Sequence, residues 1–323
     1  MNKLIIKSAL ELKRHFPLLF EMAKYAKDRI SLHKRDKQAV HIHSLSVEAL
    51  KAYNADLYKH YTGDVLDWEN LRSYSEKMQY AKLFDHDPRK VVCADKYAVR
   101  EWVKERIGEQ YLIPIIDVYE KYSDIDFDTL PERFVIKTNH ASGDAVLVKN
   151  KSRMTMAERL EMRRKIEIAL KTDYGALLLE WHYSRITPPL IIVSEFIDAG
   201  EKGLTDYKFF CFDGVPYCCQ VETDRFGDRR VDIYDMDWTL MPWNQGYNTS
   251  GELMEKPENF EKMVEIVSIL SAGFSHVRVD LFNVDGKIYF GEMSFTNESG
   301  FRKFAPESVN DTMGALWRLN MER

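Results

Sequence analysis

Short apolar runs separated by polar turns dominate the chain beyond residue 110, whereas the first 90 residues are polar and carry irregularly spaced apolar positions. The short runs have the length, the β-branched content and the flanking turn residues of strands. We therefore expect strands over the following segments: 111–119, 134–137, 145–148, 190–197, 207–212, 215–222, 276–282 and 287–293.

Three segments have helical spacing or helix-start signals instead. They are 95–107, which Gly108 is placed to end, 155–171, and a helix within 254–274 opened by Pro257-Glu258. Asp-Gly turns at positions 213–214 and 285–286 join neighbouring strands into hairpins. Because hairpins and helices are mixed without strict β-α alternation, the pattern predicts an α+β fold with antiparallel sheets.

The first 90 residues are predicted to form a mainly helical region that precedes a larger domain over residues 91–323. Between Met1 and Arg35 the chain carries nine Lys or Arg residues and three acidic residues. A basic amphipathic segment of this kind can lie on an anionic membrane surface or on a partner protein. The alternative is an ordinary solvated helix face.

Composition narrows the class of protein. The chain has 323 residues, 45% hydrophobic content and a formal net charge of −5, which argues against sequence-independent nucleic-acid binding. The apolar residues near the N-terminus are interrupted too soon by charges for a signal peptide, and no apolar run is long enough for a membrane span. The cysteines form no Cys-x-x-Cys pair, so we expect a reduced, cytoplasmic protein.

Lys137 ends a predicted strand and is followed by a small polar loop, residues 138–144, before the next strand. A lysine supplies positive charge and a glycine-containing loop supplies backbone N–H donors, a combination that suits phosphate. Ser142-Gly143 could equally form a plain β-turn.

Asp280 and Glu292 lie on two strands joined by a tight turn, and we expect them opposite each other on one face. Two facing carboxylates repel unless a cation lies between them, and magnesium prefers such oxygen ligands. Arg278 shares that face and could hold a phosphate. The alternative is a surface ion pair of Arg278 with a carboxylate.

These features, in this order, resemble the ATP-grasp superfamily, and more closely its TupA-like family. The resemblance covers residues 70 to 310. The segments that carry it are Ala94–Glu101, Phe134–Gly143, Asp206–Gly214, Tyr234–Trp238, Val277–Asp280 and Phe290–Glu292.

The resemblance implies two α+β subdomains that clamp ATP between antiparallel sheets, with a lid over residues 115–190 and a metal-binding, catalytic subdomain over 191–310. By the same resemblance, Arg100, Lys137, Ser142, Gly143 and Lys208 would contact the ATP phosphates. Glu195, Phe196 and Ile197 would face adenine, and Asp206 would face ribose. Asp280 and Glu292 would bind Mg2+, and Arg278 would steady an acyl-phosphate, with Lys137, Lys208 and Arg278 as the catalytic residues.

The chain departs from the family pattern where Ser294 stands in place of an asparagine ligand, which puts a second metal ion in doubt. The acceptor neighbourhood implied by the resemblance contains Ser299, Gly300 and Arg302, with a surface turn as the alternative. His140 could touch phosphate or substrate, or could be a structural loop histidine.

The activity implied by the resemblance is ATP-dependent joining of a carboxylate to an amine through an acyl-phosphate. The carboxylate would be on a cell-surface glycan or polymer precursor, such as a uronic acid, and the amine could be an amino acid. Three alternatives stay open: an ATP-grasp kinase that phosphorylates a hydroxyl, a glycosyltransferase of surface-glycan synthesis, and a non-catalytic scaffold. Contact of the basic N-terminus with the inner face of the membrane would be peripheral.

Overall fold

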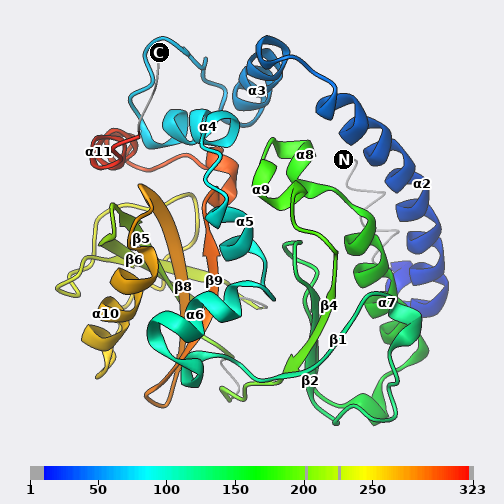
Figure 1. Cartoon of the computed structure of the whole chain (residues 1–323). Helices are drawn as coiled ribbons and strands as arrows, with labels where there is room; N and C mark the ends of the chain where they lie inside the picture. Colours follow the sequence, from blue (N-terminus) through cyan, green and yellow to red (C-terminus); the bar gives the residue numbers. More distant parts are fainter. Residues whose placement is uncertain (1–10, 201–202, 225–226, 320–323) are drawn as a thin grey trace. The chain divides into compact units, whose positions relative to one another are not determined.

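The computed structural model describes residues 11–200, 203–224 and 227–319, and the chain divides into two compact units (Figure 1). The first unit comprises Met1–Ser44, Pro114–Leu177 and Tyr183–Phe196, and the second comprises Leu45–Ile113, Leu178–His182 and Ile197–Arg323. Each unit has its own antiparallel sheet.

The sheet of the first unit has the strand order β1-β4-β2-β3. The strands are β1 (Ile115–Tyr119), β2 (Phe134–Thr138), β3 (Val146–Val148) and β4 (Ile191–Glu195). Helix α7 (Met156–Lys171) packs on this sheet through Met162 and Ile166, which share a core with Phe134 and Ile136. A capping box between Thr155 and Glu158 fixes where α7 begins.

Helix α2 (Pro17–His43) lies along α7 in the same unit (Figure 1). Ion pairs join the two helices. The guanidinium of Arg164 in α7 lies 3.0 Å from the carboxylate of Glu21 and 2.8 Å from that of Asp28, both in α2. Arg164 and Glu21 are both almost fully buried, so removing either partner would leave an uncompensated buried charge. The short helices α8 (Tyr174–Leu178) and α9 (Trp181–Ser184) follow α7.

The sheet of the second unit has the order β7-β6-β5-β8-β9. Its strands are β5 (Asp206–Phe212), β6 (Val215–Thr223), β7 (Arg230–Tyr234), β8 (His276–Val284) and β9 (Lys287–Ser294). Helix α10 (Phe260–Ser271) covers one face of this sheet, where Phe260 stacks on Phe209 of β5. Side chains of alternate residues point to the opposite face.

That opposite face is apolar only at one end. There Phe210, Phe212 and Cys218 pack with Tyr74 of α4 (Tyr74–Phe84) and with Trp317, which directly follows α11 (Ser308–Leu316). The remaining helices of this unit are α3 (Val47–Thr62), α5 (Arg89–Ala94) and α6 (Val99–Ile107). The other end of this face carries the charged residues described below.

The expected fold class is confirmed: the chain is α+β with antiparallel sheets, and both Asp-Gly hairpins form. The strand expected from residue 111 begins only at Ile115, because Glu109–Tyr111 forms a 3-10 turn and Pro114 has no N–H to donate. The helix expected from residue 95 begins at Val99, because the side chain of Asp95 accepts the N–H groups of Tyr97 and Ala98 in a turn.

The expected boundary near residue 90 does not coincide with the boundaries between the units. Residues 11–44 belong with the first unit because α2 packs on α7, whereas the segment from residue 45 onward belongs with the second because α4 packs on α11. The segments expected as lid, 115–190, and as catalytic subdomain, 191–310, fall largely in the first and second units respectively.

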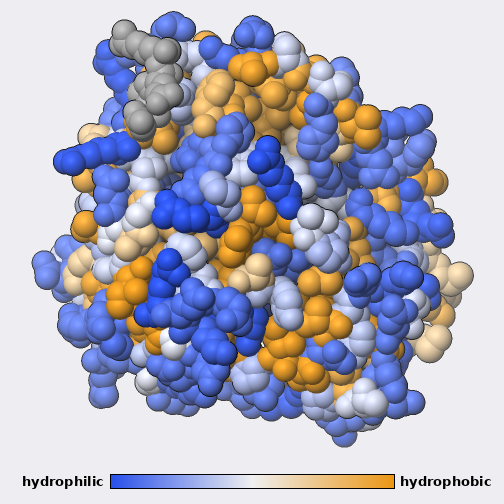
Figure 2. All heavy atoms as spheres, viewed as in Figure 1, coloured by the Kyte–Doolittle hydropathy of each residue, from blue (hydrophilic) through white to orange (hydrophobic). Residues whose placement is uncertain are grey.

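All four cysteines are free and buried. Hydrophobic residues reach the visible surface in several patches among hydrophilic ones (Figure 2). Among the helices in the described ranges, none combines the length and the apolar character needed to cross a bilayer.

His276, the first residue of β8, has its side chain buried in the apolar core of the second unit and provides a test of this core. Its Nδ1 lies 3.0 Å from the Cys211 carbonyl oxygen, its Nε2 lies 2.8 Å from the Tyr74 hydroxyl, and its ring stacks on Phe212. Burial lowers the pKa of His276 to about 3 from its ordinary value of 6.5.

We expect this buried histidine to make the protein less stable in acid. Below pH 6.5 the histidine is protonated in the unfolded chain but stays neutral in the folded protein. Each unit by which the pH falls should therefore lower the free energy of unfolding by up to about 1.4 kcal/mol. Urea unfolding between pH 4.5 and 8 should show a shallower acid limb in His276→Gln than in the wild type. Equal slopes in the two proteins would contradict this interpretation.

Candidate functional site

The sheet of the second unit carries a row of charged side chains on the face opposite α10. Asp206 and Lys208 of β5 are two residues apart and so share a face. Cross-strand pairing places Asp280 of β8 opposite Lys208, and Glu292 of β9 opposite Asp280. Glu222 of β6 stands opposite Asp206, which completes a row across four strands.

Two one-residue register shifts create this row. Counting back from the Asp285-Gly286 turn without interruption would pair Asp280 with Gly291, but the register shifts after Asp280 and Glu292 takes that place. A Cβ on Gly291 would lie 2.9 Å from the Asp280 carbonyl oxygen, so the bulge requires glycine there. A similar shift in β6 places Glu222, rather than Val221, opposite Asp206.

Lys208 is the cation at the centre of the row. Its Nζ lies 3.2 Å from Glu222, 3.6 Å from Asp280 and 3.9 Å from Asp206, and its side chain is 8% exposed. Asp206, Glu222 and Asp280 are buried as well. One buried ammonium group thus compensates three carboxylates, and Arg229 adds a second cation 2.6 Å from Glu222.

Arg278 holds the second half of the row. Its guanidinium donates two hydrogen bonds of 2.7 Å to the Asp280 carboxylate, a bidentate arrangement, and lies 3.3 Å from Glu292. The Ser294 hydroxyl lies 3.3 Å from the same guanidinium and 3.4 Å from Glu292. The cation expected between the two carboxylates is therefore supplied in this structure by Arg278.

The row contains oxygen ligands suitable for a magnesium ion. The side chain of Glu292 is 39% exposed, and Asp280 faces it across the ladder. Within the part of the chain that the structure describes, no three His, Cys, Asp or Glu side chains group closely enough to hold a metal by themselves. A magnesium ion bound by two carboxylates would take its other ligands from phosphate and water, as this ion ordinarily does.

Sequence reasoning missed Glu222 and Arg229. The sequence pattern predicts Glu222 only as the last residue of a hairpin strand, because uninterrupted pairing would place its side chain on the face opposite to that of Asp206. Its face is set by the register shift in β6, which pairs Gln220 with Lys208 and so places Glu222, two residues further on, opposite Asp206. Arg229 lies outside any strand, and no periodicity points to it.

In the first unit, Lys137 lies in β2 and pairs with Ile192 of β4. The loop after it is closed by Asp144, whose carboxylate accepts the Thr138 N–H at 2.6 Å. Ser142 and Gly143 are exposed at the loop tip, and Gly143 has a positive φ of 77° with open space around its Cα. The tip is therefore accessible, and the contact of Ser142 and Gly143 with phosphate stays a prediction.

His140 faces the protein instead of the loop opening. Its ring is buried, with Nε2 3.1 Å from the Ala169 carbonyl oxygen of α7 and Nδ1 3.2 Å from the Asn139 side chain. These contacts favour the structural alternative, so we give His140 no ligand role.

The residues expected to face adenine lie where the chain passes from the first unit to the second. Glu195 ends β4, is exposed, and donates its N–H to the Pro114 carbonyl oxygen at 3.0 Å. Phe196 is the last residue of the first unit and Ile197 is the first residue after the crossing into the second.

Arg100, which is expected to contact phosphate, lies in α6, and its guanidinium donates to the Ile113 carbonyl oxygen at 2.9 Å.

The expected acceptor residues divide into two groups. Ser299 and Gly300 are buried: the Ser299 hydroxyl donates to Glu180 at 2.7 Å, and its backbone N–H is taken by the Thr296 carbonyl oxygen. Both hydrogen-bond donors of Ser299 therefore have partners within the protein. Arg302 is exposed and lies 3.5 Å from Glu298.

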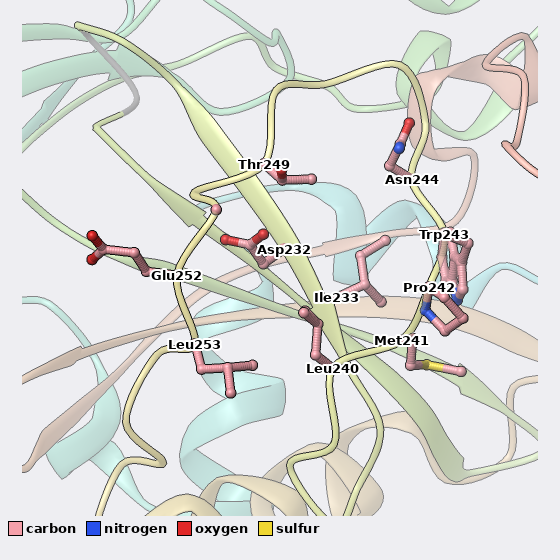
Figure 3. Close-up of a pocket in the computed structure, with 11 residues that line it drawn as sticks. Asp232, Ile233, Leu240, Met241, Pro242, Trp243, Asn244, Thr249, Glu252 and Leu253 are labelled. Carbon is pink, nitrogen blue, oxygen red and sulfur yellow. The ribbon is translucent and has the colours of Figure 1, made fainter.

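A pocket of about 280 Å³ lies elsewhere in the second unit, against the edge strand β7. Ile233, Leu240 and Met241 gather along one side of it, and Asp232 lies on another (Figure 3). The Asp232 carboxylate accepts the Ser250 N–H, so this buried charge serves the loop that forms the pocket. None of the expected site residues lines it.

The family model described as TupA-like ATPgrasp matches residues 76–318. The chain belongs to the TupA-like ATP-grasp family. Both the predicted family and the predicted ATP-grasp fold are thereby confirmed. Among curated proteins, none matches the chain.

Solved structures of ATP-grasp enzymes are similar at low identity. D-alanine–D-alanine ligase from Bacillus anthracis complexed with ATP is 17% identical with a TM-score of 0.36, over 63% of this chain and 54% of that one. N5-carboxyaminoimidazole synthetase from Staphylococcus aureus complexed with ADP is 14% identical with a TM-score of 0.38, over 63% and 44%. The ATP-grasp ligase PsnB, complexed with minimal precursor, Mg and ADP, is 12% identical with a TM-score of 0.34, over 64% and 52%.

The chain spans about half the length of these three structures. At these TM-scores the similarity carries no argument about substrate, and the family assignment rests on the family model.

The bulge at Gly291 gives a direct prediction. Gly291→Ala should lower the unfolding free energy by about 1–3 kcal/mol, because the new methyl group meets the Asp280 backbone. Gly286→Asn, in the turn of the same hairpin, has open space and a left-handed conformation that asparagine tolerates, and should cost less than about 1 kcal/mol. Urea unfolding of both variants measures this, and equal losses would show that the bulge is not constrained.

Proposed function

We propose that the protein is an ATP-dependent ligase that joins a carboxylate to an amine through an acyl-phosphate. The observation that carries the proposal is the paired row Asp280–Glu292 with Arg278 and Lys208, in a chain of the TupA-like ATP-grasp family. Carboxylates and cations interleaved at this spacing are suited to phosphate chemistry, in which charge must be neutralised as it moves.

The reaction proceeds in two steps. An oxygen of the substrate carboxylate attacks the γ-phosphorus of ATP, the bond to the β-phosphate oxygen breaks, and ADP leaves. The amine nitrogen then attacks the acyl carbon, inorganic phosphate leaves, and the nitrogen gives up a proton to form the amide. Neither step needs a protein nucleophile, and no residue in the row has to form a covalent bond.

In this proposal, the ATP-binding residues contact different parts of the nucleotide. Lys137 and the loop tip at Ser142 and Gly143 bind phosphate oxygens, together with Arg100. Glu195, Phe196 and Ile197 contact adenine, and Asp206 contacts ribose. These roles rest on the resemblance of the motifs together with the exposed loop tip and the chain crossing at residue 196.

Asp280 and Glu292 would hold Mg2+ in the proposed site, with Ser294 beside them. When bound, the ion neutralises phosphate charge. Arg278, which contacts both carboxylates in this structure, would steady the acyl-phosphate oxygens, and Lys208 would keep the buried carboxylates of β5 and β6 compensated.

Loss of one carboxylate tests the proposal. Asp280→Asn should lower the rate of ATP-dependent ADP release in the presence of both substrates by at least about 100-fold. The reason is that one of the two carboxylate ligands proposed for magnesium is lost. Asp285→Asn makes the same change at the exposed hairpin turn and should leave the rate unchanged. A coupled assay of ADP release measures these rates, and thermal unfolding shows whether each variant folds. A wild-type rate in Asp280→Asn would refute the role of Asp280 as a magnesium ligand.

The proposed substrates are an amino acid and a uronic acid, or another carboxylate, of a cell-surface polysaccharide precursor. The resemblance to a family associated with surface polymers supports this choice. A kinase would release ADP and leave a phosphorylated hydroxyl without an amide, and a glycosyltransferase would require a nucleotide sugar in place of ATP. Mass detection of the product separates these alternatives.

The proposed location is the cytoplasmic side of the membrane, with α2 in contact with the lipid surface. Phe16, Leu19, Met22 and Ile30 recur on one side of the helix and are each more than half exposed, Ile30 at 71%. Glu21 and Asp28 lie on the other side, where Arg164 neutralises them.

The exposed charges of α2 are therefore mostly positive. Within this helix, which the structure describes from end to end, the exposed basic residues are Lys27, Arg29, Lys34, Arg35 and Lys37, and the exposed acidic residue is Asp36. A basic helix face with exposed apolar side chains matches an anionic lipid surface, while the protein as a whole carries a net charge of −5.

Vesicle sedimentation tests this contact. The protein should bind vesicles rich in phosphatidylglycerol but not pure phosphatidylcholine vesicles, and Lys27→Glu, Lys34→Glu and Lys37→Glu combined should abolish binding. A control with the same change in net charge, Lys104→Glu, Lys262→Glu and Lys287→Glu, should bind like the wild type. Equal binding by both triple variants would rule out α2 as the contact.

A further inference from the structure

Two arginine side chains approach one tyrosine ring in the second unit. The guanidinium carbon of Arg229 lies 4.3 Å from the centroid of Tyr247, and that of Arg302 lies 4.5 Å from it. The three residues come from three separate segments: the chain before β7, the loop after it, and the segment after β9. Only the tertiary fold brings them together.

Tyr247 fixes this arrangement from its hydroxyl end. Its hydroxyl donates to Glu298 at 2.8 Å, and Glu298 also lies 3.5 Å from Arg302. Burial and the neighbouring Glu298 raise the pKa of Tyr247, so the phenol stays neutral and the ring keeps its electron-rich faces for the two cations. Two like charges held beside one ring favour an anion between or beside them.

Both arginine side chains are partly accessible. The side chains of Arg229 and Arg302 are 35% and 42% exposed, although each already has one carboxylate neighbour. A guanidinium has five N–H donors, so one carboxylate partner leaves donors for a second anion. Planar carboxylates are the anions that such donors bind in pairs.

The arginine pair adjoins the proposed reaction centre within the same unit. Arg229 contacts Glu222, Glu222 contacts Lys208, and Lys208 contacts Asp280, at 2.6, 3.2 and 3.6 Å. Three successive ion pairs therefore join the tyrosine–arginine cluster to the carboxylate that we assign to magnesium. A carboxylate at the cluster would lie beside that centre and would not be the one that is phosphorylated.

We propose that Arg229, Tyr247 and Arg302 bind the carboxylate of the amine substrate, so that the nucleophile is an amino acid with its own α-carboxylate. This inference rests on the proposed ligase function and assigns a binding site within it. The subsite selects amino acids against amines without a carboxylate, because such an amine leaves the remaining guanidinium donors without a second anion.

Kinetics with matched amines tests the subsite. Glycine, L-alanine and L-glutamate are each compared with the corresponding α-carboxamide, using ATP, magnesium and a glucuronate acceptor, with ADP release and conjugate mass as readouts. The wild type should use at least one amino acid with a kcat/KM at least tenfold above that of its carboxamide.

Variants locate the effect. Arg302→Gln should raise the KM for the amino acid at least tenfold, leave the KM for ATP unchanged and abolish the preference over the carboxamide. Arg302→Lys, which keeps the charge but not the planar fork, should restore part of the preference. Lys303→Gln, the neighbouring exposed cation paired with Asp64, serves as control and should behave like the wild type.

The possible outcomes distinguish a failure of the proposed carboxylate subsite from a failure of the proposed ligase function. Conjugates formed equally well from amino acids and carboxamides would overturn the subsite and leave the ligase intact. A KM rise for the glucuronate acceptor in Arg302→Gln, with none for the amino acid, would assign the cluster to the polymer and overturn the inference. ADP release from none of the amines would refute the proposed ligase and the subsite with it.

Discussion

The register of two hairpins is the constraint on which the charged face depends. One extra residue in β9, at Gly291, and one in β6 move Glu292 and Glu222 onto the face of Asp280 and Asp206. Because side chains alternate along a strand, a slip of one residue would turn each carboxylate toward α10 and put an apolar residue in its place. The close approach of Gly291 to the Asp280 backbone holds one of these bulges.

Charge balance follows from that register. Lys208 can serve three carboxylates only because four strands present their polar side chains at the same level of the sheet. Arg278 does the same for Asp280 and Glu292. Buried charges of this kind contribute little net stability compared with an apolar core, since desolvation offsets most of their attraction. Stability alone therefore does not account for their arrangement, which is consistent with the ligand site that we propose.

The apolar parts of the fold were predictable because local pattern decides them. The α7 segment, the strand pairs and the Asp-Gly turns each carry their signal within a short stretch of chain. The pairing of Asp280 with Glu292 was also predicted, although the simple hairpin count that suggests it would have given Gly291 instead. Glu222 was missed for the converse reason, because its strand bulges without any sign in the sequence that we recognised.

The candidate ligand residues show the same division. Ser142 and Gly143 are exposed at a loop tip, as their composition suggests, whereas His140 and Ser299 turn inward to partners on α7 and at Glu180. A histidine or serine in a polar loop has the same sequence signature whether it faces solvent or protein. Only the packing of distant segments against the loop decides between the two.

By itself, the sequence determined the α+β class, most of the strands, the family and the residues Lys137, Asp280 and Glu292 as candidates. The tertiary structure alone decided the bulges, the sharing of Lys208 among three carboxylates and the meeting of Arg229 and Arg302 at Tyr247. The physical reason is range: propensity and periodicity act between near neighbours in the chain. In the second unit, register and charge compensation depend on groups up to about 70 residues apart that meet only when the chain folds.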